Sequence, residues 1–537
     1  MIRRFAKAVA LFSLLTSVMT WPQVVHLGTA ASRHEDVFFN MWRLGWVAHA
    51  LAKSPARVLD GNIFFPEPRT LTFSDAMPVE SILATPLLWS GVQPVLVHNL
   101  MLLGGIILSA AGIFVLAARL TGSTTAGITA GIVFAFVPYR FDHYMHLELQ
   151  WTVWIPWAFW ALHKMFDSGS LRDAALLGVF TALQFMSSVY YGIFLCTLLA
   201  VCGLLLLCGR KKTEIPTRAR AIATAGIIAG LLIAPYVIPY AITRQRVGPR
   251  PEEQLGMFSA RAASYRAATE TNYLYGERSL RLGRPERRLF PGILPMLLAV
   301  TGLLLVAVSD EMIMYLVGLA VAFEMSFGLK SYLFTFLYHH VPAFDGLRAP
   351  ARLGIFVIFF LAVLAANGQS ILERTLGRRV RYVLAFAIPA VLLLEYWVAP
   401  LPLIGYTSSP PPLYAWLATQ PTGVVAEFPI PEPITLPGNE PRYAYMSTFH
   451  FMPLLNGYSG YYPASYLARL ERLKGMPDDT ALQTLVGAGV RYVIIHTAFY
   501  RPAATREIVS VLESHSRFRE LGRFDDEFGT AVVFAAR

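Results

Sequence analysis

Charged residues are scarce in this chain of 537 residues, in which Asp, Glu, Lys and Arg together make up 15%. Soluble domains carry roughly 25%. Hydrophobic residues account for 55%, and the mean hydropathy is +0.50. This composition excludes an ordinary soluble protein and predicts a polytopic membrane protein with polar attachments. The net charge of +11 is typical of cytoplasmic loops and of surfaces that face anionic lipid, so it does not indicate nucleic-acid binding.

Cysteine is also rare, because only Cys196, Cys202 and Cys208 occur and all three fall in one apolar run. This placement provides neither a disulfide framework nor the spacing of a metal site. The sequence has no P-loop, no GxGxxG after a strand, no GxSxG and no HExxH motif. It also shows no inverted repeat of the kind that many transporters have, and this absence favours an enzyme over a transporter.

Long apolar runs are abundant, and a span needs about 20 apolar residues. The N-terminal run has no small-residue cleavage pattern before Trp21, so we expect an uncleaved first span. The run over 174–208 would be ~52 Å long as one helix, which exceeds a bilayer core of ~30 Å, so we divide it near Ser187 and Ser188. Eleven candidate spans result: roughly 5–22, 96–118, 124–138, 149–164, 172–187, 189–208, 221–241, 290–308, 311–328, 352–369 and 381–399.

The distribution of Lys and Arg predicts a cytoplasmic N-terminus, since it places most basic loops inside. The outer segments are then 23–95, 139–148, 242–289 and 329–351, together with the tail. We therefore expect a membrane module over 1–399 and an extracytoplasmic α/β domain over 400–537. In the tail, strands are predicted over 424–429, 491–496, 518–523 and 530–535, and helices over 465–474, 479–488 and 503–515.

The first outer segment begins with the acidic pair Glu35 and Asp36, which His34 precedes and several aromatic residues follow. Asp75 and Glu80 add two further acids to the same loop. Ionised groups at a membrane face tend to line sites or pathways, because burying them beside lipid costs several kcal/mol. We interpret this stretch as the acidic edge of an active site for a lipid-carried substrate. The alternative is interfacial polarity with an aromatic belt.

The second outer segment, 139–148, combines Asp142, His143, His146 and Glu148. Imidazole and carboxylate groups suit zinc or manganese. A pair of histidines three residues apart is a weak metal pattern, so the sequence favours a substrate-binding turn over a metal site. A third interpretation is that these side chains are ordinary polar residues at the membrane interface.

Arginine is concentrated in the third outer segment, where ten arginines lie between residues 244 and 288. Guanidinium groups are suited to bidentate phosphate binding, and the positive-inside rule does not explain a cluster outside. Arg348 and Arg352 follow near the next outer membrane surface, where a lipid phosphate would lie. The alternatives are that the arginines of the long loop are tolerated surface charge and that Arg348 and Arg352 anchor the protein at lipid headgroups.

The tail contains a loop over 447–463 that is rich in Tyr, Phe, His and Asn. Such a loop could stack on a sugar ring and hydrogen-bond its hydroxyl groups, and we take His450, Asn456 and Tyr458 as candidate contacts. The same loop could instead form the seam between the tail and the membrane module.

The segments HEDVFFNMWRLGW, TLTFSD, FAFVPYRFDHYMHLELQ, LFPG, VPAFDGLRAPAR and STFHFMPLLNGYSGYYPASY, with about eleven spans and an α/β tail, resemble the GT-C glycosyltransferases. The similarity is to a bacterial branch of these integral membrane enzymes, which use polyprenyl-phosphate-linked sugars. It covers nearly the whole chain, but it is architectural and its motifs are loose. The acid of the first outer loop carries over to Asp36 or Glu35, although the pair here is Glu-Asp rather than the more common Asp-Asp or Asp-Glu.

The resemblance implies an inverting transfer of a sugar from a polyprenyl-phosphate donor to a glycan, lipid or protein acceptor, with the acid as general base. It also implies a multi-pass protein of the bacterial inner membrane. Glu35, Asp75 or Glu148 could hold a divalent cation such as Mg²⁺ or Mn²⁺, since some relatives depend on a metal and others do not. The alternative hypotheses are a non-catalytic protein that binds or transports lipid-linked glycans and an assembly factor whose tail recruits envelope partners.

Overall fold

A computed structural model describes residues 2–305, 309–526 and 528–537. The chain divides into two compact units. The first comprises residues 1–26, 100–238 and 248–402, and the second comprises 27–99, 239–247 and 403–537. The first outer segment therefore belongs to the same compact unit as the tail.

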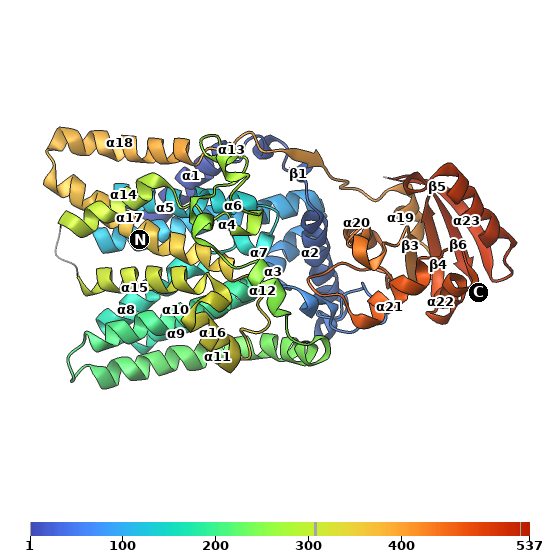
Figure 1. Ribbon diagram of the computed structural model, residues 1–537, viewed down its shortest axis with the longest axis horizontal. Helices are drawn as coiled ribbons and strands as arrows, with labels where there is room; N and C mark the ends of the chain where they lie inside the picture. The colour runs from blue at the N-terminus through green and yellow to red at the C-terminus, as the bar shows by residue number, and fades with distance from the viewer. Residues whose placement is uncertain (1, 306–308, 527) are drawn as a thin grey trace. The chain divides into compact units, whose positions relative to one another are not determined.

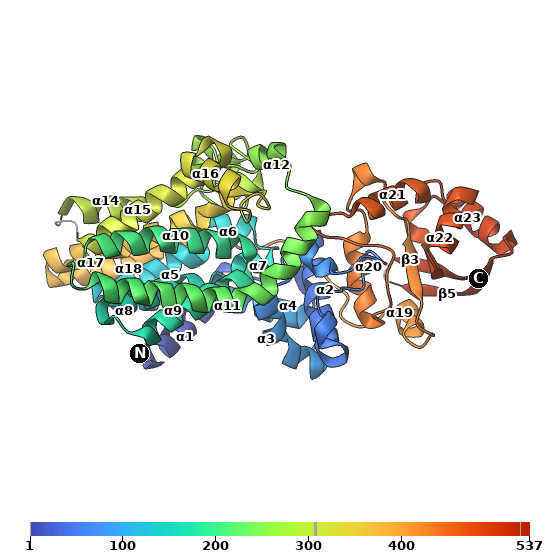
Figure 2. The same ribbon diagram turned by 90° about the horizontal axis from the view of Figure 1, so that it is seen from below.

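The first unit is built from long apolar helices that lie side by side (Figures 1 and 2). Serine hydroxyls begin several of them: Ser123 accepts a hydrogen bond from the backbone N–H of Ala126, and Ser309 accepts one from Met312. Such caps satisfy backbone donors that a helix leaves open at its start. The long helices are α1 (Ile2–Met19), α4 (Pro94–Thr121), α5 (Thr124–Phe136), α8 (Trp154–Ser168), α9 (Leu171–Ser187), α10 (Val189–Cys208), α11 (Ile215–Val247), α14 (Ile293–Leu305), α15 (Asp310–Met325), α17 (Gly354–Thr375) and α18 (Arg378–Glu395).

Short helices occupy the segments between the long ones. They are α6 (Pro138–Asp142), α7 (Leu147–Gln150), α12 (Glu252–Met257), α13 (Gly276–Ser279) and α16 (Tyr332–His340). Two short 3₁₀ turns, η5 (Pro285–Arg287) and η7 (Pro350–Leu353), carry charged residues of the site described below.

Each of the eleven apolar segments predicted to span the membrane overlaps one of the long helices. Residues 306–308, at the end of the predicted segment 290–308, lie outside the described residues. Four stretches in the described part are long and apolar enough to cross a membrane: Pro94–Thr121, Val189–Cys208, Ile215–Val247 and Pro350–Thr375. The fold is thus that of a helical membrane protein, and the count of eleven spans stays a prediction.

The break between α9 and α10 falls at Ser188, as predicted from the length of the apolar run. Ser188 has extended backbone angles, and its N–H still donates to the carbonyl of Gln184. Elsewhere, α14 packs directly against α17 because both helices carry glycine at the contact. A Cβ on Gly368 would come within 1.8 Å of the carbonyl oxygen of Leu298, so only glycine fits there.

The tail contains both helices and strands, as the sequence predicted. Its sheet has the order β3-β4-β6-β5, in which β3 and β4 are parallel and β6 runs antiparallel to both of its neighbours. The elements are β3 (Val424–Phe428), β4 (Val490–His496), β5 (Phe518–Asp526), β6 (Gly529–Ala536), α19 (Pro412–Leu417), α20 (Glu440–Met446), α21 (Ala464–Leu473), α22 (Asp479–Gly487) and α23 (Pro502–Ser514).

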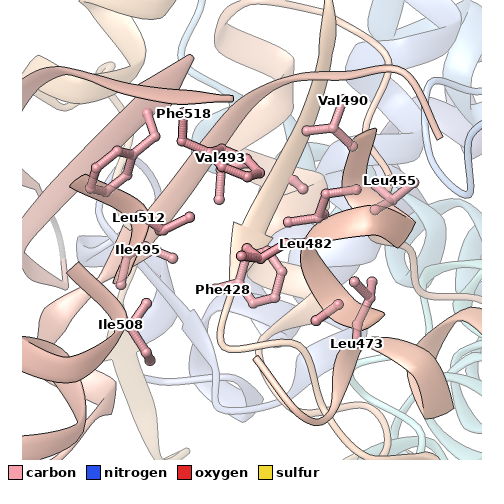
Figure 3. Packing of buried hydrophobic residues seen from close by; sticks show 14 of the residues in the cluster. Phe428, Leu455, Leu473, Leu482, Val490, Val493, Ile495, Ile508, Leu512 and Phe518 are labelled. Atoms are coloured by element: carbon pink, nitrogen blue, oxygen red, sulfur yellow. The ribbon is translucent and has the colours of Figure 1, made fainter. Parts of the chain in front are cut away.

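The hydrophobic core of the tail lies where α21, α22 and α23 pack on the sheet (Figure 3). Phe428, Val493 and Ile495 come from the strands, and Leu482 and Leu512 come from the helices. These side chains are buried. Burying a large aliphatic side chain contributes roughly 1.5–3 kcal/mol. This cluster therefore stabilises the packing of the helices on the sheet.

The first outer segment supplies the rest of the second unit. It contains α2 (Glu35–Lys53), α3 (Pro78–Trp89) and the short strand β1 (Ala30–Ser32). β1 pairs antiparallel with β2 (Leu403–Gly405), which lies at the start of the tail. α2 begins directly at the acidic pair of Glu35 and Asp36.

A buried charge cluster connects three strands of the tail, β3, β4 and β5. His496 at the end of β4 lies between two carboxylates, with Nε2 2.9 Å from Glu427 Oε2 and Nδ1 2.8 Å from Asp526 Oδ2. Tyr414 donates a hydrogen bond of 2.6 Å to the same oxygen of Glu427. Burial by itself would lower the pKa of His496, but the two carboxylates raise it to about 9. The protonated imidazole therefore compensates the buried acids at neutral pH.

We predict that this cluster makes the tail less stable as the pH rises. Because the pKa of His496 is higher in the folded chain than its ordinary value of 6.5, its contribution is complete below about pH 6.5 and is lost as the pH passes through about 9. Hydrogen–deuterium exchange of the β4 and β6 amides should therefore differ most between wild type and His496→Gln at pH 6. The difference should shrink by pH 9.5, and a constant difference would contradict the assignment.

Candidate active site

The acidic pair lies in the first turn of α2, where His34 is the N-cap. The imidazole Nδ1 of His34 accepts a hydrogen bond of 3.1 Å from the backbone N–H of Asp36. Carboxylates are stabilised at this end of a helix by the partial positive charge of its free N–H groups. Glu35 is about half exposed, at 53%, whereas the side chain of Asp36 is 21% exposed. Asp36 is thus the more enclosed of the two acids and remains accessible.

Asp36 is held by a tyrosine that is distant in sequence. The hydroxyl of Tyr458 donates a hydrogen bond of 2.6 Å to Asp36 Oδ1. The Tyr458 ring packs edge-on against Phe39, one turn along α2, with 5.1 Å between ring centroids. Burial and the neighbouring Asp36 carboxylate raise the pKa of Tyr458 well above its ordinary value. The phenol therefore stays protonated and acts as a donor.

The other predicted acids of this loop have different surroundings. Asp75 is half-buried, and its backbone carbonyl accepts a hydrogen bond from Arg43. Glu80 lies in the first turn of α3 and is fully buried. Arg43 is itself buried, donates to Asn40 and lies over the Phe39 ring at 4.6 Å. Glu80 and Arg43 therefore belong to the interior of the second unit rather than to an exposed surface.

A second cluster forms in the first unit from His143, His146 and Glu286. His143 follows α6, His146 precedes α7, and Glu286 lies on η5 in the Arg-rich loop. One ligand atom from each residue lies within 4.8 Å of the other two. Glu148, on α7, is buried and acts electrostatically on His143.

These three residues fit a divalent metal ion. Both ring nitrogens of His143 are buried and lack a hydrogen-bond partner among the described residues. Burial lowers the pKa of His143 to about 3, so its imidazole is neutral and can act as a ligand. Burial works against the charge of Glu286, but Arg352 and the two neighbouring histidines together hold the pKa of that carboxyl far below its usual range. Two imidazoles and one carboxylate suit zinc or manganese.

Arg352 and Arg348 occupy different environments. Arg352 on η7 donates a hydrogen bond of 2.6 Å from Nε to Glu286 Oε1 and lies over the Tyr190 ring at 4.6 Å. Arg348 lies 5.6 Å from the ring centroid of Phe258 and, among the residues that the structure describes, has no carboxylate within ion-pair distance. Arg352 therefore orients Glu286, whereas Arg348 forms no ion pair within the described part of the chain.

The Arg-rich loop is partly internally paired. Arg288 is buried and contacts Asp142 at 3.1 Å and Glu270 at 3.3 Å. Arg287 behaves differently, because burial and then the like charges of Arg261 and Arg284 lower its pKa. In the described part of the chain, none of Arg261, Arg284 and Arg287 forms an ion pair. A cluster of like charges without acids favours an anion.

The candidate sugar-binding residues of the tail divide into two groups. Tyr458 reaches Asp36, whereas His450 and Asn456 are engaged inside the tail. His450 accepts from the N–H of Met452 through Nδ1, and burial lowers its pKa to about 3. The amide of Asn456 bonds the backbone of Glu427 and the carboxylate of Glu440. We therefore do not retain His450 and Asn456 as ligand contacts.

Sequence reasoning did not identify Glu286 or Glu440. The only signal for Glu286 is one acid inside the basic stretch RPERR, which by itself reads as a surface ion pair. Glu440 stands among prolines and tyrosines in NEPRYAY and carries no motif. Both acids acquire their roles from residues that are far away in sequence.

No protein-family model matches the chain, and no curated protein matches its sequence. Among solved structures, the fold is similar to that of ArnT from Cupriavidus metallidurans bound to undecaprenyl phosphate, with a TM-score of 0.50 and 12% sequence identity. The similarity covers 98% of this chain and 97% of that chain. At this identity it concerns the fold, and it supports the GT-C fold that the sequence resemblance implied.

We predict that the full-length protein, purified without chelators, carries zinc or manganese at the cluster of His143, His146 and Glu286. Because removing one of three ligands weakens a site sharply, His143→Ala and Glu286→Gln should each lose most of the bound metal in elemental analysis. His339→Ala, which alters an exposed histidine, should retain it. Equal metal content in all four proteins would contradict the site.

Proposed function

We propose that the protein is a membrane glycosyltransferase that moves a sugar from a polyprenyl-phosphate donor to an extracytoplasmic acceptor with inversion. The observation that carries the proposal is the accessible carboxylate of Asp36, held by the Tyr458 hydroxyl at 2.6 Å on a GT-C fold. The undecaprenyl phosphate bound to ArnT supports a lipid carrier of this class.

In this proposal Asp36 acts as the general base. It takes the proton of an acceptor hydroxyl while the hydroxyl oxygen attacks the anomeric carbon of the donor sugar. The bond between that carbon and the phosphate oxygen breaks, and the polyprenyl phosphate leaves with the electron pair. A single displacement inverts the configuration at the anomeric carbon. Positioned general bases contribute roughly 10²–10⁴-fold in rate.

Asp36 suits this role better than Glu35. One carboxylate oxygen of Asp36 is fixed by Tyr458, while the side chain remains partly exposed. A base must be held within hydrogen-bond reach of the proton that it removes. Glu35 is about half exposed and contacts the ring of His34 only at 3.9 Å, so its side chain is less restrained.

The donor phosphate would bind cationic groups that have no acidic partner. Arg348 and the cluster of Arg261, Arg284 and Arg287 meet this condition among the described residues. Their guanidinium groups would stabilise the charge that develops on the leaving phosphate. A divalent ion held by His143, His146 and Glu286 would add Lewis-acid stabilisation of phosphate oxygens.

The proposed location follows from the charge of the loops and from the fold. The apolar helices place the protein in a membrane. We propose the bacterial inner membrane, with a cytoplasmic N-terminus and with residues 400–537 outside the cytoplasm. The acceptor would then be a glycan, lipid or protein of the cell envelope.

We predict that Asp36→Asn traps the donor on the enzyme. Mass spectrometry of lipids that co-purify with the detergent-solubilised protein should detect polyprenyl phosphate or its glycosylated form in wild type. Because Asp36→Asn removes the base but no phosphate contact, the sugar-loaded form should accumulate there. Arg348→Ala should retain less polyprenyl lipid of either form. Asp525→Asn, on an exposed edge of the tail, serves as the matched control.

Two results would contradict this assignment. Polyprenyl lipid that is retained in the same form by wild type and Asp36→Asn would point to a carrier that binds lipid-linked glycans without transferring them. Bulk phospholipid alone, in all four proteins, would exclude a donor site and favour an assembly role. The lipid that accumulates in Asp36→Asn would also identify the sugar by its mass.

A further inference from the structure

The segment that carries Tyr458 is built more rigidly than an ordinary loop. It begins at Leu454, which forms a parallel bridge with Val425 beside β3. The backbone N–H of Val425 donates to the carbonyl of Pro453, and the N–H of Leu455 donates to the carbonyl of Val425, both at 2.8 Å. The start of the segment is therefore attached to the sheet of the tail as an additional short edge.

Asn456 fixes the next step of the chain. Its side-chain oxygen accepts a hydrogen bond of 2.8 Å from the N–H of Glu427, and its Nδ2 donates to the carbonyl of the same residue at 2.8 Å. The side-chain amide thus forms with β3 the two hydrogen bonds that the backbone of a neighbouring strand would form. Asn456 is completely buried, so this pairing is shielded from competing water.

The fully buried Glu440, at the start of α20, completes the anchor. One carboxyl oxygen accepts from Asn456 Nδ2 at 2.9 Å, and the other accepts from the backbone N–H of Gly457. Burial raises the pKa of Glu440 to about 8, although these hydrogen bonds oppose the shift. Both residues that precede Tyr458 are therefore held by one side chain.

The first outer segment contacts the same point. The N–H of Phe64 donates to the carbonyl of Asn456 at 2.8 Å. A Cβ on Gly457 would lie 2.4 Å from the Phe64 ring, so glycine is required for this close approach. The segment that carries Asp36 and the segment that carries Tyr458 are thus joined at Phe64 as well as at the carboxylate itself.

We infer that Tyr458 is a positioning residue that orients Asp36 for proton transfer, and that Glu440 and Asn456 are the buried supports that hold it in place. The inference rests on the proposed function, because it requires Asp36 to be the base. It assigns to the tail a direct contribution to the chemistry, through a side chain that contacts the base rather than the substrate.

The test compares turnover and donor retention in the full-length protein. Wild type, Tyr458→Phe, Glu440→Gln and Asp36→Asn are purified in detergent and supplied with a total lipid extract of host membranes and a membrane fraction as the acceptor source. Mass spectrometry follows the conversion of glycosylated polyprenyl phosphate to polyprenyl phosphate. Tyr492→Phe is the matched control, since it removes a tyrosine hydroxyl bond to the Pro421 carbonyl in the same unit.

We expect Tyr458→Phe to lower the turnover number roughly 10- to 100-fold, as the loss of one hydrogen bond to a charged group allows, with unchanged retention of the donor and an unchanged melting temperature. The Phe ring still packs on Phe39, so the fold is preserved. Glu440→Gln should lower turnover in the same direction, because its amide cannot accept from both Asn456 and Gly457. Adding Tyr458→Phe to Asp36→Asn should have no further effect.

The outcomes separate this inference from the proposed function. If Asp36→Asn slows the conversion and Tyr458→Phe behaves as wild type, the positioning role is wrong and the general base stands. If Tyr458→Phe loses donor retention or melting temperature together with turnover, its role is structural, and the inference fails. If Asp36→Asn converts the donor at the wild-type rate, the proposed function itself fails.

Discussion

The hydrogen bond between Tyr458 and Asp36 is the contact on which the proposed active site depends. It joins residues 422 positions apart, and bringing such distant segments together costs conformational entropy. A single hydrogen bond contributes only about 1.5–3 kcal/mol even when one partner is charged. The contact is therefore sustained by what surrounds it: the edge added to β3, the buried carboxyl of Glu440 and the packing of Phe64 against Gly457.

In the first unit, buried charges are likewise stabilised by contacts between segments that are distant in sequence. Removing one member of a buried ion pair typically costs 3–5 kcal/mol, because the remaining charge is left without compensation. The pairs Arg352–Glu286 and Arg288–Asp142 are both largely shielded from water. They connect the Arg-rich loop to η7 and to α6, so the segments that carry His143 and Glu286 are fixed relative to each other by charge as well as by packing.

Hydropathy and residue patterns predicted much of the fold. Apolar runs predicted the long helices, and even the break at Ser188 followed from the length of a helix and the thickness of a bilayer. The strands of the tail followed from short β-branched runs such as the one over β4. The start of α2 at Glu35 could not be predicted, because His34, an uncommon cap, provides the capping group through its ring nitrogen.

The pairing of polar side chains was not predictable from the sequence. Arg348 and Arg352 are four residues apart and look equivalent, yet one is bound to Glu286 and the other forms no ion pair in the described chain. Likewise, Asn456 and Tyr458 lie in one aromatic loop, but the amide points into the tail and the phenol reaches Asp36. These differences depend on tertiary contacts between loops. Loops have no regular hydrophobic periodicity from which such contacts could be predicted.

The arginines of the Arg-rich loop differ in whether they form ion pairs with acids in the described chain, and this difference explains why the loop is so basic. Ten arginines outside the membrane would be unfavourable if they only repelled each other. Arg288 is neutralised by Asp142 and Glu270, which makes it part of the framework. Burial and the like charges of Arg261 and Arg284 lower the pKa of Arg287, and an anionic ligand would relieve that repulsion. The polyprenyl phosphate of the proposed function would supply such an anion at the membrane surface.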